Sequence, residues 1–294
     1  MSRHRLLLNP EATHDSVVAR WEAQGKLSGL EVVIPRDPED MTAQARRAVH
    51  EGFDRILVAG GDGAVHRALQ GLAGTGCAMG IVPLGSGNDL ARALDLPRDP
   101  WRAARFAMEG PSRAIDLGRA GRRWFAGIAG VGLDAAVNRY VRRHRKSRLG
   151  RGIYPWAAVR TLASFQPPFL RIEHENGAWE GRAIQALLAN SPYFGGGMKI
   201  APRALLDDGF LDLLVIAAIP KYKLLMLLPR VYRGSHARHP AVTSLRVRRA
   251  TLRAKDAPRL HADGEPMMAL PREGVTVEVV PRTLLVIADA PLKQ

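Results

Sequence analysis

Short apolar segments alternate with helical patterns through the first third of the chain, and this alternation restricts the fold more than any other feature. Four segments have the length and composition of strands: residues 5–8, 30–34, 55–59 and 78–83. Helical patterns are expected at residues 16–24, 42–50, 65–72 and 89–94. In the third of these, apolar side chains recur at the i, i+3, i+4 and i+7 spacing of an amphipathic helix. Strands that alternate with helices predict a parallel sheet with helices on its faces.

The pattern changes after about residue 115, where longer apolar segments and alternating segments follow one another. Residues 182–190 and 210–219 have the composition of buried strands, and valines alternate with other residues at 275–279. Helical stretches are expected near residues 154–164 and 221–232. The second half therefore predicts mainly antiparallel β structure.

The length of the chain agrees with a division into two parts. At about 150 residues per domain, 294 residues correspond to two domains. We expect an α/β domain at residues 1–115 and a β-rich domain at residues 116–288. The last residues of the chain are a candidate to rejoin the first domain.

Composition excludes several classes of protein. Hydrophobic residues make up 46% and charged residues 24%, so a largely disordered chain is not expected. Cys77 is the only cysteine, which excludes a disulfide framework and a Cys-rich zinc site and fits a reducing cytosol. The first residues lack the apolar core of a signal peptide, and apolar runs such as 213–219 are far shorter than the ~18 residues that span a bilayer. We therefore expect a cytoplasmic protein without membrane-spanning segments.

Positive charge is concentrated in two segments of a chain whose formal net charge is +15. Residues 119–152 contain ten Lys or Arg and one acid, and residues 221–259 contain eleven Lys or Arg and one acid. The rest of the chain is net acidic. The two basic segments suit an anionic membrane surface or nucleic acid, or they form an ordinary solvated face. They lack interleaved aromatic residues and nucleic-acid-binding motifs, which disfavours nucleic acid.

The sequence Gly60-Gly61-Asp62-Gly63 lies between a predicted strand and a predicted helix. Successive glycines let backbone N–H groups approach a phosphate, and a helix N-terminus favours negative charge. An acid in such a loop repels phosphate unless Mg²⁺ lies between them or the acid orients the reacting hydroxyl. The alternative is a tight Asp-Gly turn without a ligand. The loop matches neither a Walker A sequence nor a Gly-x-Gly-x-x-Gly fingerprint.

A second polar, glycine-rich loop, Pro83-Leu84-Gly85-Ser86-Gly87-Asn88-Asp89, follows the next strand. Ser86 and Asn88 could donate to a phosphate or a ribose, or either could cap the following helix. Ligands of open α/β sheets bind beyond the carboxyl ends of the strands. Two such loops at one edge therefore indicate a ligand site more strongly than one loop does.

Two acidic turns occur in the second half. Asp263-Gly264-Glu265 separates two strand-like segments and by spacing alone is a hairpin turn, although its carboxylates could supply a base and a metal contact. Asp207 and Asp208 precede a buried strand, either as a turn or as part of a structural cation site. The nine histidines have no metal-ligand spacing, and the sequence contains no Gly-x-Ser-x-Gly elbow that would indicate a hydrolase.

Taken together, these residues resemble the diacylglycerol kinase-like lipid kinases of bacteria. The resemblance runs in family order over about residues 5–290 and includes further motifs. These are Asn9-Pro10, Leu90-Ala91-Arg92, Gly130-Val131-Gly132-Leu133-Asp134, Asn190 with Gly195-Gly196-Gly197-Met198, Ile200-Ala201-Pro202 and Asp208-Gly209. NAD kinases and phosphofructokinases share Gly-Gly-Asp-Gly, whereas the stretch from Gly85 to Arg92 favours the lipid kinases.

The resemblance implies a Rossmann-like α/β domain followed by a mainly antiparallel β-sandwich. Residues of the first domain would bind ATP: Asn9, Pro10, Thr42, Gly60, Gly61, Asp62, Gly63, Ala64, His66, Arg67, Gly85, Ser86, Asn88 and Asp89. Asp62 would act with Mg²⁺ near the transferred phosphate, and Glu265 would accept the proton of the substrate hydroxyl with Asp263 beside it. A structural Mg²⁺ would be held by Leu205, Asp208 and Phe210, with the Leu and the Phe contributing carbonyls.

This chain departs from the family pattern beside the first glycine loop. Relatives usually read Gly-Gly-Asp-Gly-Thr and then Asn-Glu after one residue, where this chain has Ala64, His66 and Arg67. A hydroxyl is lost, and a base replaces an acid. The Ser-Gly usually found near Thr13 is absent, and Ser86 replaces a Thr but keeps the hydroxyl. These changes bear on nucleotide affinity and substrate identity more than on the fold.

We therefore expect an ATP-dependent lipid kinase of phospholipid biosynthesis, with ATP and Mg²⁺ as cofactors. It would phosphorylate diacylglycerol or a related lipid alcohol and dock peripherally on an anionic membrane surface. The alternatives are a soluble-substrate kinase of the NAD-kinase type and a non-catalytic regulator that binds lipid or nucleotide. No nucleic-acid partner is expected, and the sequence leaves the oligomeric state open.

Overall fold

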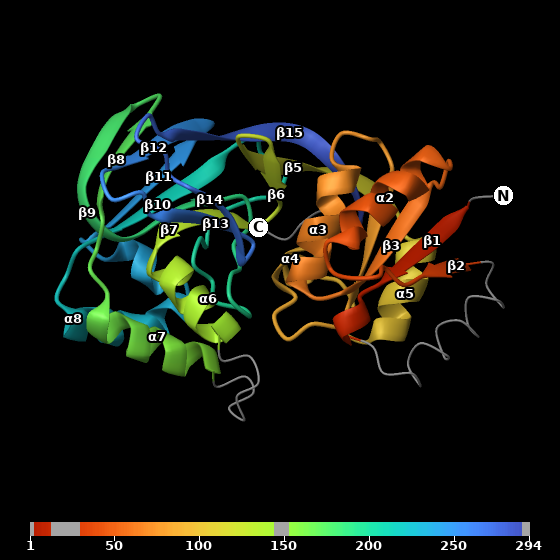
Figure 1. Ribbon diagram of the computed structural model, residues 1–294, viewed down its shortest axis with the longest axis horizontal. Coiled ribbons are helices and arrows are strands. Elements are labelled where there is room, and N and C mark those ends of the chain that lie inside the picture. The colour runs from red at the N-terminus through yellow and green to blue at the C-terminus, as the bar shows by residue number, and fades with distance from the viewer. Residues whose placement is uncertain (1–2, 13–29, 144–152, 290–294) are drawn as a thin grey trace. The chain divides into compact units, whose positions relative to one another are not determined.

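A computed structural model of the chain describes residues 3–12, 30–143 and 153–289 (Figure 1). The chain forms two compact units, the first made of Met1–Leu117 and Pro281–Gln294 and the second of Gly118–Val280. The chain passes from the first unit to the second within strand β5 (Ser112–Ala120) and returns within strand β15 (Val275–Ile287). The helix expected at residues 16–24 lies outside the described residues.

The first unit is built on a parallel sheet. From one edge, its strands are β2 (Leu30–Val33), β1 (His4–Leu8), β3 (Arg55–Gly60), β4 (Ala78–Pro83) and the end of β15. Each of these strands is parallel to its neighbour, as the alternation of strands and helices predicted. The register brings Leu8, Ala59 and Val82 to one level, so β1, β3 and β4 end together.

Helices cover the sheet of the first unit. They are the 3₁₀ turn η1 (Pro10–Ala12) and α2 (Asp40–His50), α3 (Asp62–Leu72), α4 (Asp89–Ala93) and α5 (Pro100–Glu109). Helix α5 packs Ala103, Ala104 and Ala107 against side chains of β1, β3 and β4. Helices α2 and α3 pack on each other and against the same strands. The sequence did not single out α5, although its N-terminus is capped by Asp99, whose carboxylate accepts the N–H of Arg102 at 2.9 Å.

The second unit consists mainly of antiparallel strands. They are β6 (Arg123–Phe125), β7 (Ile128–Gly132), β8 (Phe169–His174), β9 (Gly177–Ala189), β10 (Leu211–Ala217), β11 (Val242–Val247), β12 (Arg249–Ala254), β13 (Arg259–Ala262) and β14 (Glu265–Ala269). The start of β15 pairs with β12, also antiparallel. This architecture confirms the fold class expected from the sequence.

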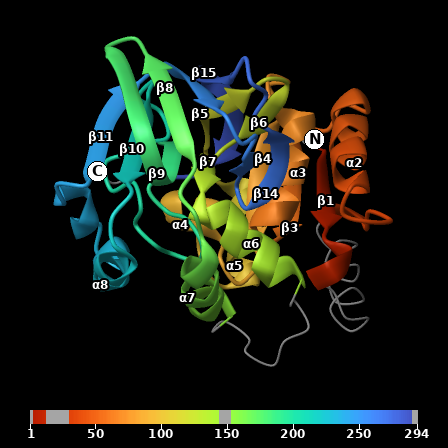
Figure 2. The ribbon, with the colours of Figure 1, turned by 60° about the vertical axis from the view of Figure 1, so that its left-hand side comes forward.

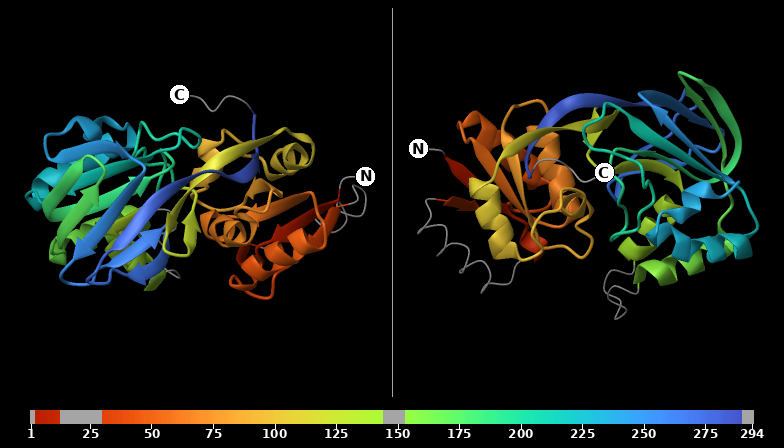
Figure 3. Two further views of the ribbon diagram at one scale, coloured as in Figure 1. Left: turned by 90° about the horizontal axis from the view of Figure 1, so that it is seen from above. Right: turned by 180° about the vertical axis from the view of Figure 1, so that it is seen from behind.

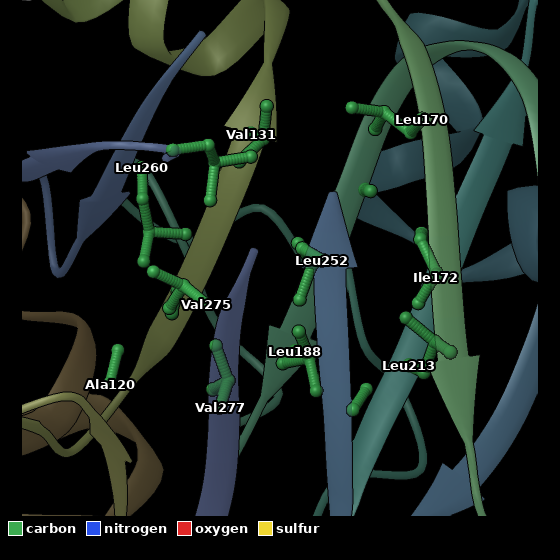
Figure 4. Packing of buried hydrophobic residues seen from close by; sticks show 14 of the residues in the cluster. Ala120, Val131, Leu170, Ile172, Leu188, Leu213, Leu252, Leu260, Val275 and Val277 are labelled. Carbon is green, nitrogen blue, oxygen red and sulfur yellow. The ribbon is translucent and has the colours of Figure 1, made fainter. Parts of the chain in front are cut away.

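Strand β9 belongs to two sheets of the second unit. Its first half pairs with β8, which in turn pairs with β12, and its second half pairs with β7 and β10. Fully buried side chains from both sheets form one core, and Figure 4 shows Leu188, Leu213, Leu252 and Val277 converging there. Burial alternates along β8, β12 and the start of β15, which explains the alternating apolar pattern there, whereas β7, β10 and the second half of β9 are buried at nearly every position.

Helices of the second unit gather on one side of its strands (Figures 2 and 3). They are α6 (Leu133–Arg143), α7 (Ile153–Ser164), α8 (Lys221–Tyr232) and the 3₁₀ turn η3 (Ser235–Arg238). Helices α7 and α8 coincide closely with the expected helical stretches, whereas α6 and β8 were not expected. None of the helices in the described ranges is both long enough and apolar enough to cross a bilayer.

Candidate functional site

In the first unit, the candidate nucleotide residues gather where three parallel strands end. Asn9 follows β1, Gly60 ends β3, and Pro83 ends β4. The backbone N–H of Asn9 donates to Ala59 O at 2.9 Å, and the N–H of Leu84 donates to Gly60 O at 2.9 Å. These bonds continue the sheet past the last paired residues, so the loops leave the sheet from one level.

The two glycine loops lie directly against each other. A Cβ atom on Gly61 would be 3.0 Å from the Cα of Gly85, and a Cβ on Gly85 would overlap the Cα of Gly61. A Cβ on Gly60 would be 2.6 Å from the Cβ of Ala64 and 3.1 Å from that of Asn9. Only glycine allows this approach, and it leaves the loop backbones close together at the carboxyl edge of the sheet.

Asp62 joins the two loops. It is the first residue of α3, and its Oδ1 accepts the backbone N–H of Asp89, the first residue of α4, at 2.7 Å. Two helices therefore start beside one carboxylate. Carboxylate oxygens are ligands that Mg²⁺ prefers, so Asp62 and Asp89 are of the right chemical type to hold a metal–nucleotide complex.

Asn88 shapes the second loop. Its backbone is left-handed, with φ of 53°. Its side-chain oxygen accepts the N–H of Gly85 at 3.0 Å, and its side-chain nitrogen donates to the carbonyl of Gly85 at 2.7 Å. Both polar atoms of the amide thus close the loop, while the neighbouring Ser86 is exposed. Of the two donors expected here, Ser86 is the one that the loop presents outward.

The remaining candidates of the first unit lie along α2 and α3. The hydroxyl of Thr42 donates to the carbonyl of Arg67 at 2.7 Å and so links the two helices. Arg67 donates to Gly63 O at 3.2 Å, and its guanidinium lies 3.9 Å from the carboxylate of Glu39. His66 is 3% exposed, and Ala64 is also buried. Direct contact of these residues with a nucleotide stays a prediction.

In the second unit, Asp263 anchors the expected hairpin turn. Strands β13 and β14 pair around it, which confirms the hairpin predicted from spacing. Its carboxylate accepts three backbone N–H groups: Ala126 at 3.1 Å, Gly127 at 2.9 Å and Ile128 at 3.0 Å. Its own N–H donates to Ile128 O at 3.0 Å. Asp263 therefore fastens the turn to the start of β7.

Glu265 is the first residue of β14 and follows the fastened turn directly. Asp263 and Gly264 both have positive φ, 50° and 82°, which makes the turn tight. Glu265 pairs across the hairpin with Ala262 and is half-buried. The backbone of a residue at the end of a tight, anchored turn has few conformations available. Its side chain therefore starts from a fixed position, which is what a proton acceptor requires.

The expected structural cation site lies in the loop before β10. Asp208 accepts the N–H of Phe210 at 3.0 Å, and its other carboxylate oxygen is ion-paired with Arg246. Arg246 also lies over the ring of Phe210, with 4.4 Å between its Cζ and the ring centroid. Burial, with a contribution from the charge of Asp208, raises the pKa of Asp212 to about 6.

The oxygen donors of this loop fit Mg²⁺ in type, but Arg246 already neutralises Asp208. A metal ion at Asp208 therefore requires the guanidinium to move. No cluster of three or more His, Cys, Asp or Glu side chains able to hold a metal occurs in the part of the chain that the structure describes. Metal ligation by Leu205, Asp208 and Phe210 stays a prediction.

A polar cluster that the sequence did not single out as a site lies at the end of β7. The side-chain oxygen of Gln185 accepts the N–H of Asp134 at 2.9 Å. Gln185 is 6% exposed, and its amide nitrogen is buried without a hydrogen-bond partner among the described residues. Desolvation by burial raises the pKa of Asp134, while Gln185 and the nearby His261 lower it. No motif rule links a helix, a strand and a hairpin that are this far apart in sequence, so only the fold reveals the cluster.

Two family models match the chain. The diacylglycerol kinase catalytic domain matches residues 3–120, and the YegS C-terminal NAD kinase beta sandwich-like domain matches residues 127–288.

Named relatives align over much of the chain. A diacylglycerol kinase of Mycobacterium tuberculosis is 33% identical over 293 residues, which cover 96% of this chain and 93% of the relative. A diacylglycerol kinase of Staphylococcus aureus is 30% identical over 241 residues, or 81% of this chain and 76% of the relative. The crystal structure of a diacylglycerol kinase from Bacillus anthracis superposes with a TM-score of 0.80 at 19% identity, covering 98% of both chains. At 19% identity, the superposition supports a shared fold and nothing more.

Proposed function

The chain belongs to the diacylglycerol kinase family and is a lipid kinase, and we propose that it transfers the γ-phosphate of ATP to the hydroxyl of diacylglycerol or a related lipid alcohol at a membrane surface. Such a reaction depends on positioning and on neutralising phosphate charge more than on covalent catalysis. The proposal assigns these tasks to different residues in the two units.

The first unit holds the nucleotide in this proposal. Backbone N–H groups of the two glycine loops, with Asn9 and Ser86, bind the phosphates and the ribose. Support comes from the contact of Gly61 with Gly85, which leaves backbone rather than side chains at the carboxyl edge of the sheet. When bound, Mg²⁺ supplies charge neutralisation at the phosphates, and Asp62 and Asp89 are the residues that would hold it.

The second unit activates the acceptor. Glu265 accepts the proton of the lipid hydroxyl as the hydroxyl oxygen attacks the γ-phosphorus, and the bond from the γ-phosphorus to the β–γ bridging oxygen breaks to release ADP. Asp263 acts through Glu265, because its carboxylate fixes the turn by accepting three backbone N–H groups. It is therefore a positioning residue rather than a second base, which refines the role suggested by the sequence resemblance.

The observation that carries the proposal is the Asp62 carboxylate, held at the start of α3 by the N–H of Asp89 where the two glycine loops touch. An acid is out of place in a simple anion-binding loop, because it repels phosphate. It has a role if the ligand is a nucleotide that carries Mg²⁺.

The test is transfer of labelled γ-phosphate from Mg-ATP to a panel of lipid alcohols in anionic micelles. We expect label in an organic-extractable product, abolished in Asp62→Asn and Glu265→Gln. Asp95→Asn and Glu273→Gln are matched controls, since both side chains are exposed acids outside the proposed site, and they should retain the wild-type rate.

Three results would contradict the proposal. Transfer to NAD without transfer to any lipid would indicate a soluble-substrate kinase. ATP binding without transfer to either would indicate a regulator. Transfer that survives both Asp62→Asn and Glu265→Gln would place the chemistry at other residues.

A further inference from the structure

Helices α7 and α8 of the second unit expose an unusual amount of apolar surface. Seven large hydrophobic side chains are exposed among the described residues, and six of them lie on these two helices: Trp156, Val159, Tyr222, Leu225, Met226 and Tyr232. Met226 is 71% exposed, Tyr222 62% and Trp156 52%. Scattered apolar residues are normal on a protein surface, but a concentration on adjacent helices indicates an interaction surface.

The exposed residues of α8 are not core residues left uncovered by chance. Leu224, Leu227 and Val231 form the buried stripe of α8, and Leu224 packs with Leu162 of α7 against the strands. At 3.6 residues per turn, Tyr222 and Met226 fall on the opposite side of the helix from that stripe. The helix therefore has one apolar face toward the core and a second apolar face toward solvent.

The two helices lie directly against each other. The ammonium group of Lys221, at the start of α8, donates to the carbonyl of Ala163, near the end of α7, at 2.6 Å. The helices also pack on each other, and Figures 1 and 2 both show them side by side.

Positive charge borders the apolar stripe. Lys221, Lys223 and Arg230 are exposed on α8, and Arg160 is exposed on α7 beside Trp156 and Val159. Neither helix contains an acidic residue. Aromatic and aliphatic side chains rimmed by Lys and Arg are typical of helices that lie in the interface of an anionic bilayer.

We propose that α7 and α8 dock on the surface of an anionic lipid bilayer, with Tyr222, Met226 and Trp156 entering the headgroup region. This inference rests on the proposed function, since a lipid acceptor has to be taken from a membrane. A second copy of the chain suits the face poorly, because pairing two such faces brings Lys and Arg of both copies together without an acid between them. Nucleic acid would match the charge but not the apolar stripe.

Vesicle binding provides the first test. The full chain is sedimented with vesicles of phosphatidylcholine alone or of equal parts phosphatidylcholine and phosphatidylglycerol. We expect binding to the anionic vesicles only, weakened about tenfold or more by Tyr222→Ser with Met226→Ser, and weakened by Lys223→Gln with Arg230→Gln. Ile34→Ser and Arg98→Gln are the matched controls, because they change an exposed apolar and an exposed basic residue of the first unit.

A fluorescent label provides a test that is independent of affinity. Cys77 is buried, and burial raises the pKa of its thiol to about 11, so it reacts little with thiol reagents. Met226→Cys therefore gives a single reactive site for an environment-sensitive dye, and Ile34→Cys gives the control. We expect a blue shift on anionic vesicles for the label at 226 and none for the label at 34.

Other outcomes overturn the inference. The Tyr222→Ser, Met226→Ser chain could bind vesicles as well as wild type does, or a label at position 226 could show no blue shift on vesicles that bind the chain. Either result shows that another surface contacts the membrane. A dimer in solution that dissociates in the same double variant shows that the face joins two copies. A gel shift with duplex DNA that survives physiological salt and is lost in the double variant would assign the face to nucleic acid.

Activity separates failure of this inference from failure of the proposed function. The rate on vesicle-bound diacylglycerol is divided by the rate on a short-chain diacylglycerol dispersed in solution, and the double variant should lower this ratio about tenfold. A wild-type chain that phosphorylates neither dispersed nor vesicle-bound lipid contradicts the proposed function. A ratio unchanged by the double variant contradicts the docking surface alone.

Discussion

The two units fix their candidate site residues by different means. In the first unit, the backbones of two loops are in direct contact: a Cβ on Gly85 would overlap the Cα of Gly61, and a Cβ on Gly61 would lie 3.0 Å from the Cα of Gly85. In the second unit, a side chain fastens backbone: the Asp263 carboxylate accepts three N–H groups and so holds the turn that carries Glu265. In the proposed function, the first arrangement provides backbone donors for a phosphate, and the second restrains a single carboxylate.

In the proposed function, this difference distinguishes residues that bind a ligand from residues that hold a loop in shape. The side chain of Asn88 bonds within its own loop, and the side chain of Asp263 fastens its turn to the start of β7. In the proposed function, the glycines and Glu265 are the residues that contact the reacting groups. Some residues of a motif therefore stabilise the conformation of a loop and do not bind the ligand themselves.

Among Gly85→Ala, Asp263→Asn, Asp134→Asn and Arg246→Gln, we expect Gly85→Ala to lower activity the most. Its Cβ would overlap Gly61, so the two loops must separate, and displacements near 1 Å lower rates by about a hundredfold. We expect ATP affinity and transfer rate to fall together. Gly76→Ala is the control, because no atom lies within 4 Å of the added Cβ. The φ of +74° strains an alanine there, but the new methyl group displaces no neighbouring loop. A Gly85→Ala chain with normal ATP affinity would show that the loop contact is not needed.

Asp263→Asn tests the other half of the comparison. An amide cannot accept all three N–H groups equally, so we expect a loss of about 1–3 kcal/mol in the free energy of unfolding, measured with urea. Activity should fall as well, through misplacement of Glu265. Asp256→Asn, an exposed acid of the same unit, should leave stability unchanged. Loss of activity with full stability would instead make Asp263 a catalytic residue.

Asp134→Asn should change how stability depends on pH. Burial raises the carboxyl pKa in the folded chain above its unfolded value, so the folded state holds the proton more tightly. The resulting stabilisation is present below the unfolded pKa and is lost as pH rises through the folded pKa. The variant lacks this loss, so its free energy of unfolding should gain on that of wild type as the pH rises above about 4, the unfolded pKa of an aspartate. Parallel curves for the two chains would rule out a raised pKa at this position.

Arg246→Gln should have the smallest effect. The substitution removes the positive charge that neutralises Asp208, and we expect Mg²⁺ to raise the melting temperature of the variant by about 2–4 °C more than that of wild type. Arg248→Gln is the matched control, since Arg248 also lies over the Phe210 ring, at 5.0 Å. Equal Mg²⁺ responses in all three chains would argue against a cation at Asp208.

Much of the first unit could be read from the sequence. Strand β4 matches its predicted bounds, and β1, β3 and α2 come close, because short apolar segments and helix formers are local signals. The two glycine loops were predicted to share one sheet edge, and the parallel register brings them there. Strand β8 was missed, since its charged residues Arg171 and Glu173 interrupt the apolar pattern and pair with each other.

The roles of single polar residues could not be read in this way. The sequence around Asp263 does not indicate that its side chain bonds to the backbone of residues 126–128, more than 130 positions earlier. The same holds for Arg246, which neutralises Asp208 from a neighbouring strand. Such partners are set by tertiary packing, which a motif with a fixed spacing does not encode.

The central claim is that one unit binds the nucleotide and the other activates the acceptor. Its most direct test is the Glu265→Gln chain, measured for both ATP dissociation constant and rate of label transfer to diacylglycerol. The account predicts an ATP affinity within about twofold of wild type and a transfer rate lowered about 10²- to 10⁴-fold. A variant that loses ATP affinity together with transfer, or that keeps the wild-type rate, would contradict it.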